Sequence, residues 1–80
     1  MEHLLKIIPQ FYTEVSTGNK TFEIRKNDRG YQVGDTLLLC EWLPEHEIFT
    51  GNSIRKEVIY ILHGHSFEGL DEHYVVMAIR

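Results

Sequence analysis

The stretch TGNKTFEIRKNDRG, residues 17–30, carries the strongest local pattern of this 80-residue chain. Its centre, TFEIR, alternates apolar and polar residues, as in a β-strand whose successive side chains point to opposite faces. The alternation predicts that Phe22 and Ile24 face the interior and that Glu23 and Arg25 face the other way. The basic residues of the stretch are Lys20, Arg25, Lys26 and Arg29. The pattern therefore indicates a strand with a local concentration of positive charge.

The residues before this stretch predict a strand and a short helix. The apolar run at 3–8 reads as a strand. A helix is expected from Pro9 to Gly18, because proline suits the first turn of a helix and glycine suits its C-terminal end. Phe11 and Val15 lie four residues apart and are expected to share the buried face of this helix.

The residues after the stretch predict three more strands. A polar loop ends in a turn at Gly34-Asp35, and strands are expected at 36–43, 53–64 and 73–80. The first two of these strands are expected to form a hairpin with its tip at Thr50-Gly51-Asn52. Their middle portions are apolar on both faces, which is typical of a closed or half-closed sheet. We expect an α+β fold: a small β-barrel of about five strands with one short helix after the first strand.

Length and composition favour a single soluble domain over residues 1–80. The net charge of −4 argues against a general polyanion-binding protein, but the basic residues around residue 25 favour a compact contact with an anion. Cys40 is the single cysteine, so no intrachain disulfide can form. No apolar run approaches the roughly 20 residues that span a bilayer. A cytoplasmic monomer without membrane contact is expected.

The segment GNKTFEIR resembles the G-x-K-x-x-E-x-R signature of the ASCH domain, a branch of the PUA-like β-barrel superfamily. Its four fixed positions are occupied by Gly18, Lys20, Glu23 and Arg25. The continuation VGDTLLL is similar to the glycine–aspartate turn before a central strand of PUA-like domains. KTFEIRKNDRGYQVGD…EW, with the terminal YVVMAIR, resembles small uncharacterised bacterial and phage ASCH-like proteins. The resemblance covers nearly the whole chain and implies a PUA-like barrel with a cleft for RNA or a nucleotide-like ligand beside the helix.

The resemblance implies a nucleic-acid-binding role for the signature residues. Lys20 and Arg25 are expected to contact phosphate, and Arg25 can do so through two hydrogen bonds. Glu23 can accept a hydrogen bond from an exocyclic amine such as N4 of cytosine. Tyr31 and Trp42 are candidate stacking surfaces, with packing in the core or hairpin an equal alternative for Trp42. The remaining members of the expected binding set are Lys26 and Arg29.

Other functions stay open beside RNA binding. Some small ASCH-like proteins are amidohydrolases of acetylated cytidine, with a lysine as base and a threonine three residues later as nucleophile, and others are ribonucleases. Lys20 matches the lysine, but Glu23 stands at the threonine position, so Thr21 is the candidate nucleophile. We expect binding more than turnover. Glu23 and Arg25 can also form an ordinary surface ion pair, worth under about 1 kcal/mol.

The C-terminal half raises two further possibilities. Residues 41–80 carry seven acidic and three basic side chains, which suits a protein-interaction module. His63, His65 and His73 have the chemistry for zinc binding or for acid–base catalysis in a ribonuclease. However, Gly64 and Gly69 mark this segment as a turn, and no acidic ligand spacing completes a metal site. We expect exposed loop histidines, with no metal and no cofactor.

Overall fold

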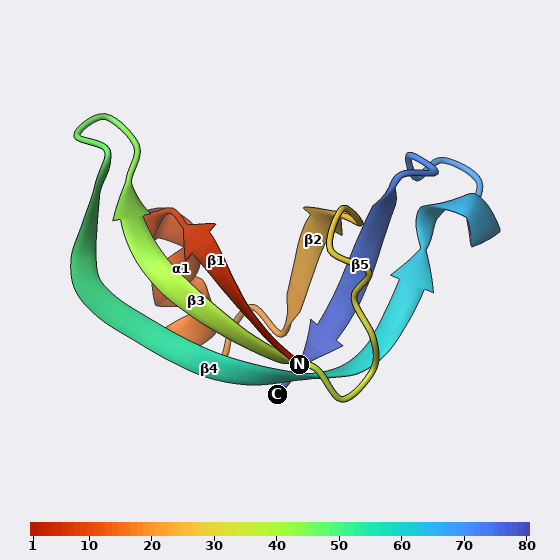
Figure 1. Cartoon of the computed structure of the whole chain (residues 1–80), viewed down its shortest axis with the longest axis horizontal. Helices are drawn as coiled ribbons and strands as arrows, with labels where there is room; N and C mark the ends of the chain where they lie inside the picture. Colours follow the sequence, from red (N-terminus) through yellow and green to blue (C-terminus); the bar gives the residue numbers. More distant parts are fainter.

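The computed structural model describes residues 1–80 and contains five strands, one α-helix and one 3₁₀ helix (Figure 1). The elements in chain order are β1 (Glu2–Ile7), α1 (Pro9–Ser16), β2 (Phe22–Lys26), β3 (Thr36–Leu43), β4 (Ile48–His63), η1 (Gly64–Ser66) and β5 (Tyr74–Ile79). The predicted order of one strand, one helix and four strands is confirmed. None of the helices has the length and apolar character needed to cross a membrane.

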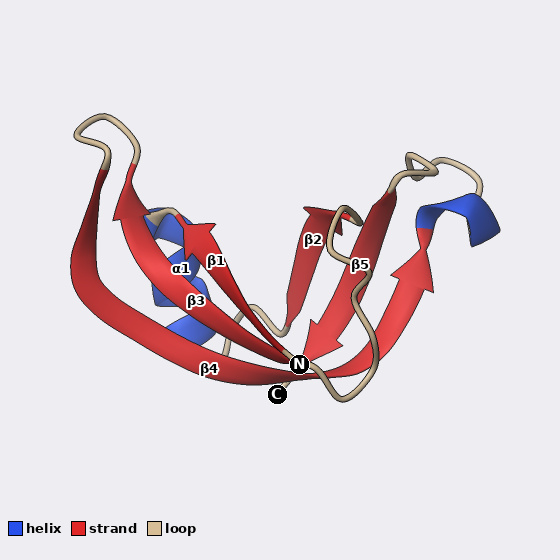
Figure 2. Cartoon of the chain, in the orientation of Figure 1, coloured by secondary structure: helices blue, strands red, loops and turns tan.

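The five strands form one mixed sheet in the order β1-β3-β4-β5-β2. β1 runs parallel to β3, and all other neighbours are antiparallel. β4 is long and strongly curved, and it belongs to both arms of the U-shaped sheet (Figure 2). Strands β1 and β2 are the two edges of the sheet and do not pair with each other. The fold is therefore a small α+β domain with one helix after the first strand, as predicted, but its sheet does not close into the expected barrel.

Arginine side chains span the gap where a barrel would close. Arg25 Nη2 donates a hydrogen bond to the carbonyl oxygen of Lys6 at 2.9 Å, and Arg29 Nη1 donates to that of Leu4 at 2.8 Å. Both acceptors lie on the free edge of β1. The edge carbonyls are thus satisfied without a neighbouring strand, which removes the need for backbone pairing there.

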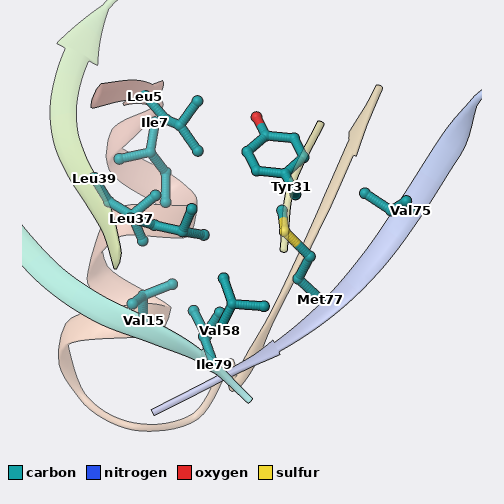
Figure 3. Packing of buried hydrophobic residues seen from close by; sticks show 10 residues of the cluster. All are labelled: Leu5, Ile7, Val15, Tyr31, Leu37, Leu39, Val58, Val75, Met77 and Ile79. Carbon is teal, nitrogen blue, oxygen red and sulfur yellow. The ribbon is translucent and has the colours of Figure 1, made fainter. Parts of the chain in front are cut away.

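The core fills the interior of the U and draws on both arms (Figure 3). Its ten buried residues are Leu5, Ile7, Val15, Tyr31, Leu37, Leu39, Val58, Val75, Met77 and Ile79. Figure 3 shows the ring of Tyr31 between the β1 side and the β5 side of this cluster. Val15 is the buried residue of the helix, and Tyr12 packs partly against the cluster. Phe11 is 44% exposed, so the predicted shared burial of Phe11 and Val15 is wrong.

The hairpin between β3 and β4 turns earlier than predicted. Its turn is formed by residues 44–47, where Glu47 has a positive φ of 53°. Residues 50–52 lie within β4 and form a bulge opposite Glu41. The Glu41 carboxylate accepts hydrogen bonds from Thr50 Oγ1 at 2.8 Å and Asn52 Nδ2 at 3.1 Å. Gly51, with φ of +96°, thus marks a β-bulge and not the tip of the hairpin.

A buried polar pair fixes the turn before β3. His3 Nε2 and Asp35 Oδ2 lie 2.8 Å apart, and the backbone N–H of Gln32 also donates to Oδ2 at 3.0 Å. The hydrogen bond with His3 is the main reason that the pKa of Asp35 lies below its usual value, although burial opposes this effect. Tyr31 packs edge-on against the His3 ring with centroids 4.8 Å apart. The pair therefore ties the start of β1 to the loop that precedes β3.

Candidate nucleic-acid interface

Strand β2 carries the signature residues, and its faces are reversed relative to the prediction. Glu23 is 3% exposed, whereas Phe22 and Ile24 are 41% and 51% exposed. The alternation of TFEIR is confirmed, but the charged face points inward and the apolar face outward. A buried carboxylate is tolerated only when it is paired, so the reversal depends on partners for Glu23.

Two cations clamp the buried carboxylate of Glu23. Lys20 Nζ lies 2.5 Å from Oε1, and Arg25 donates from Nε to Oε2 at 3.0 Å. Lys20 Nζ also donates to the carbonyl oxygen of Phe22 at 2.7 Å. The side chains of Lys20 and Arg25 are 17% and 24% exposed, so each cation keeps one side toward solvent. Because Glu23 bonds both cations, they are held side by side despite their like charge.

The end of helix α1 places Lys20 beside this carboxylate. Gly18 has φ of +83° and follows the helix as its stop, as predicted. Its N–H donates to the carbonyl oxygen of Val15 at 3.1 Å, and the N–H of Lys20 donates to that of Glu14 at 2.9 Å. The backbone of Lys20 is thus tied to the helix while its side chain reaches β2.

A cleft of about 410 Å³ lies beside the clamp, between β1 and α1 on one side and β2 on the other. Its lining residues are Lys6, Ile7, Ile8, Phe11, Lys20, Phe22, Glu23, Ile24 and Arg25. The charged members leave a formal charge of +2, on a protein whose net charge is −4. The cleft therefore combines a net positive charge with apolar side chains, and each of its two sides supplies both kinds.

Two exposed aromatic rings lie beside the Lys20 ammonium in the cleft. Lys20 Nζ lies 4.9 Å from the ring centroid of Phe22 and 5.5 Å from that of Phe11. Sequence reasoning missed both rings as site residues because it assigned them to the core. Lys6 was missed as well, and its ammonium lies 4.0 Å from the ring centroid of Trp42. Trp42 is half-buried and packs edge-on against Phe49, which agrees with the hairpin-packing alternative.

Comparisons with known proteins place the chain in a family. Residues 2–79 match the family described as "Domain of unknown function (DUF3850)". The chain belongs to this DUF3850 family. A 56-residue stretch, 70% of this chain, is 38% identical to the "Uncharacterized 12.9 kDa protein in GpA 3'region" of Escherichia phage P2. That stretch spans half of the phage protein, and the match confirms the expected likeness to small uncharacterised phage proteins.

The other predicted binding residues of this DUF3850 domain lie at the end of β2 and in the loop that follows it. Arg25, Lys26, Arg29 and Tyr31 line a smaller cavity of about 190 Å³ together with Leu5 and Asp28. Tyr31 is only 3% exposed, and burial raises the pKa of its phenol. Its position therefore leaves no open ring face for a base and does not support the stacking role expected of it. Phe11 and Phe22 provide the exposed rings instead.

The residues considered for catalysis are arranged differently from a lysine–threonine pair. Lys20 Nζ donates to Glu23 and to the carbonyl oxygen of Phe22, and no hydrogen bond joins it to Thr21. The carbonyl oxygen of Thr21 accepts from the N–H of Ile79 at 3.0 Å, so its backbone continues the sheet. In the DUF3850 domain, Lys20 thus acts as a bound cation beside Glu23. No group of three or more His, Cys, Asp or Glu side chains is arranged to hold a metal ion.

Proposed function

We propose that this domain binds single-stranded RNA or a nucleotide-like ligand in the cleft between β1, α1 and β2. The observation that carries the proposal is the clamp in which Glu23 holds Lys20 and Arg25 side by side in this cleft. The resemblance of this segment to the ASCH signature supports it, because all four fixed positions meet at this cleft or at the helix end beside it. We accordingly propose that the domain is an open-sheet relative of the ASCH group.

The free donors of the clamp suit a phosphate group. Arg25 uses Nε for Glu23 and Nη2 for the Lys6 carbonyl, which leaves Nη1 as its available donor. Lys20 and Lys6 add two ammonium groups at the same cleft. Because Glu23 already neutralises part of the charge, the cleft favours one or two phosphates over a long duplex. This limited charge is consistent with an acidic protein that makes few phosphate contacts.

The two aromatic rings of the cleft suit a nucleobase. Phe11 and Phe22 are both more than 40% exposed and line the cleft beside Lys20. Stacking of a base on an aromatic side chain contributes about 1–3 kcal/mol and tolerates any base. A volume near 410 Å³ falls within the usual range of small-ligand sites, roughly 300–1,000 Å³. A base on the rings and its phosphate on the clamp therefore account for both the aromatic and the charged residues of the cleft.

The test is fluorescence anisotropy with a labelled six-nucleotide single-stranded RNA of mixed sequence, at low and at physiological salt. Lys20→Ala and Phe22→Ala should each weaken binding about tenfold or more, since one charged contact or one stacked base contributes 1–3 kcal/mol. Arg55→Ala is the matched charge control, because Arg55 is 66% exposed and pairs with Glu2 away from the cleft. Thermal unfolding of each variant confirms that it is folded.

Two results would contradict the proposal. One is the absence of saturable binding at low salt. The other is an equal loss of affinity in Arg55→Ala and Lys20→Ala, which would indicate a diffuse response to net charge. A labelled mononucleotide in the same assay then shows whether the cleft by itself holds a single nucleotide.

A further inference from the structure

A second cavity, of about 360 Å³, lies at the far end of β2 from the clamp. β2 and β4 end there and β5 begins there, as the pairings Lys26–Tyr74 and His63–Val75 show (Figure 1). The cavity is lined by Lys26, Asn27, His63, His65, Glu72, His73, Tyr74 and Val75. We call it the histidine pocket. It brings together histidines that the chain order separates.

We infer that the histidine pocket, with Lys26, binds a phosphate group when its imidazoles are protonated. This phosphate belongs to the same nucleic-acid strand that occupies the cleft. The inference rests on the proposed function for the identity of this nucleic-acid ligand. The phosphate site itself follows from the groups that line the pocket. The ligand class is then an oligonucleotide of several residues and not a single nucleotide.

The geometry of the imidazoles favours a shared anion. The rings of His63 and His65 are stacked, with centroids 5.2 Å apart and planes 27° from parallel. Ser66 Oγ lies 3.2 Å from Nδ1 of His65, which leaves Nε2 of that ring for a ligand. Two protonated imidazoles at this separation repel each other, and an anion beside both relieves the repulsion. The arrangement therefore gains most from a phosphate under the conditions that charge the rings.

The charge of the histidine pocket reverses with protonation. The charged groups near the histidines are Lys26, Glu72 and Asp71. Lys26 and Glu72 line the pocket, Glu72 lies 3.6 Å from His73 Nε2, and Asp71 accepts a hydrogen bond from the backbone N–H of His73 at 2.8 Å. With neutral imidazoles these groups give a formal charge of −1. Three protonated imidazoles change it to +2. Protonation of the imidazoles thus turns a pocket that disfavours anions into one that favours them, and a comparison of pH 5.5 with pH 7.5 tests this change.

A continuous series of basic residues links this pocket to the cleft. Arg25 lines both the cleft and the smaller cavity, and Lys26 lines both the smaller cavity and the histidine pocket. Strand β2, which lies between the cleft and the histidine pocket, rises about 13 Å from Phe22 to Lys26. A mononucleotide is too short to reach both ends, whereas a strand of a few nucleotides follows β2 from one site to the other.

The test has two probes. The first is inorganic phosphate, titrated at pH 5.5 and constant ionic strength while the imidazole C–H resonances are followed by NMR. We expect phosphate to shift the resonances of His63, His65 and His73, while those of His46 in the hairpin turn stay unchanged. Equal shifts at His46 and in the pocket, or no shift at all, would overturn the phosphate site.

The second probe is the labelled six-nucleotide RNA, measured at pH 5.5 and 7.5. We expect affinity to rise at least tenfold at the lower pH, and this increment to disappear in the double variant His63→Gln/His65→Gln and to shrink in Lys26→Ala. His46→Gln should keep the full increment. A pH increment that survives in the double variant would overturn the inference.

The outcomes separate the two sites. If RNA binding is lost in Lys20→Ala but is independent of pH, the cleft proposal stands and the histidine pocket is not part of the site. If phosphate shifts the pocket resonances while Lys20→Ala binds RNA normally, the pocket stands and the cleft proposal fails. A mononucleotide whose affinity rises with acid as much as that of the hexamer would contradict the assignment of one strand to both sites.

Discussion

Replacing Glu23 by glutamine tests whether the clamp stabilises the fold as well as the cleft. The glutamine side chain has nearly the same size and keeps one carbonyl acceptor, but it loses the charge that Lys20 and Arg25 share. The Glu23 side chain is 4% exposed, so water cannot easily replace the lost interaction at the carboxylate itself. The substitution should therefore lower the free energy of unfolding without creating a cavity.

The size of the effect follows from the contacts. A hydrogen bond to a charged group contributes roughly 1.5–3 kcal/mol, and Glu23 accepts one such bond from each of its two cations. Both cations are partly exposed and regain water, which reduces the loss. We expect Glu23→Gln to cost about 2 kcal/mol. In a domain of this length that corresponds to a fall in Tm of roughly 8–16 °C.

The assay is urea and thermal unfolding, followed by circular dichroism, with Glu57→Gln as the control. Glu57 also accepts from an arginine Nε at 3.0 Å, but its side chain and that of Arg80 are 47% and 72% exposed. The two substitutions change the charge equally, and the exposed pair should contribute less than about 1 kcal/mol. Equal losses of stability in Glu23→Gln and Glu57→Gln would refute the idea of a buried clamp.

Three other outcomes follow from buried groups. The pKa of Asp35 is lowered mainly by its hydrogen bond with His3, so the pair stabilises the fold at pH values above the usual carboxyl pKa, near 3.8. This contribution is lost as the pH falls through the lower pKa that Asp35 has in the folded protein. Urea midpoints measured between pH 6 and pH 2 should decrease with a slope that Asp35→Asn flattens, and identical slopes would contradict the pairing. Gly64→Ala should cost about 1–3 kcal/mol or displace η1, because the new Cβ overlaps the carbonyl oxygen of Asp71, and an unchanged Tm would argue against this packing. Burial raises the pKa of Tyr31, so ultraviolet titration should show one phenol that ionises later than the others and is missing in Tyr31→Phe; coincident titration of all tyrosines would argue against its burial.

The faces of β2 show where sequence reasoning succeeds and where it stops. The alternation of TFEIR identified the strand, because a period of two is a local property of the chain. The prediction of the buried face was wrong, because which face is buried depends on partners elsewhere in the chain. The interior supplies Lys20 from the end of the helix and a carbonyl of β1 for Arg25, and these contacts make an inward Glu23 stable. Shifting a strand by one residue exchanges its two faces, so one such error misplaces every side chain.

The Gly51 segment shows a similar limit. Thr-Gly-Asn is a common turn sequence, and the glycine does adopt a positive φ. The same backbone conformation also serves a β-bulge, and only the cross-strand partner distinguishes the two. Glu41 provides that partner by binding Thr50 and Asn52 from the opposite strand. The strands were therefore predictable from their apolar runs, but the position of the turn depended on a contact between distant residues.

Arg25 shows how the structure changes the chemistry expected of a signature residue. As an isolated guanidinium it was expected to bind phosphate through two nitrogens. In the folded domain Nε is bonded to Glu23 and Nη2 to the Lys6 carbonyl on the opposite edge of the sheet. The same side chain therefore holds the two edges together and presents only Nη1 to a ligand. A phosphate at this position must complete its contacts with Lys20 or Lys6, which is why the site depends on the whole cleft and not on one arginine.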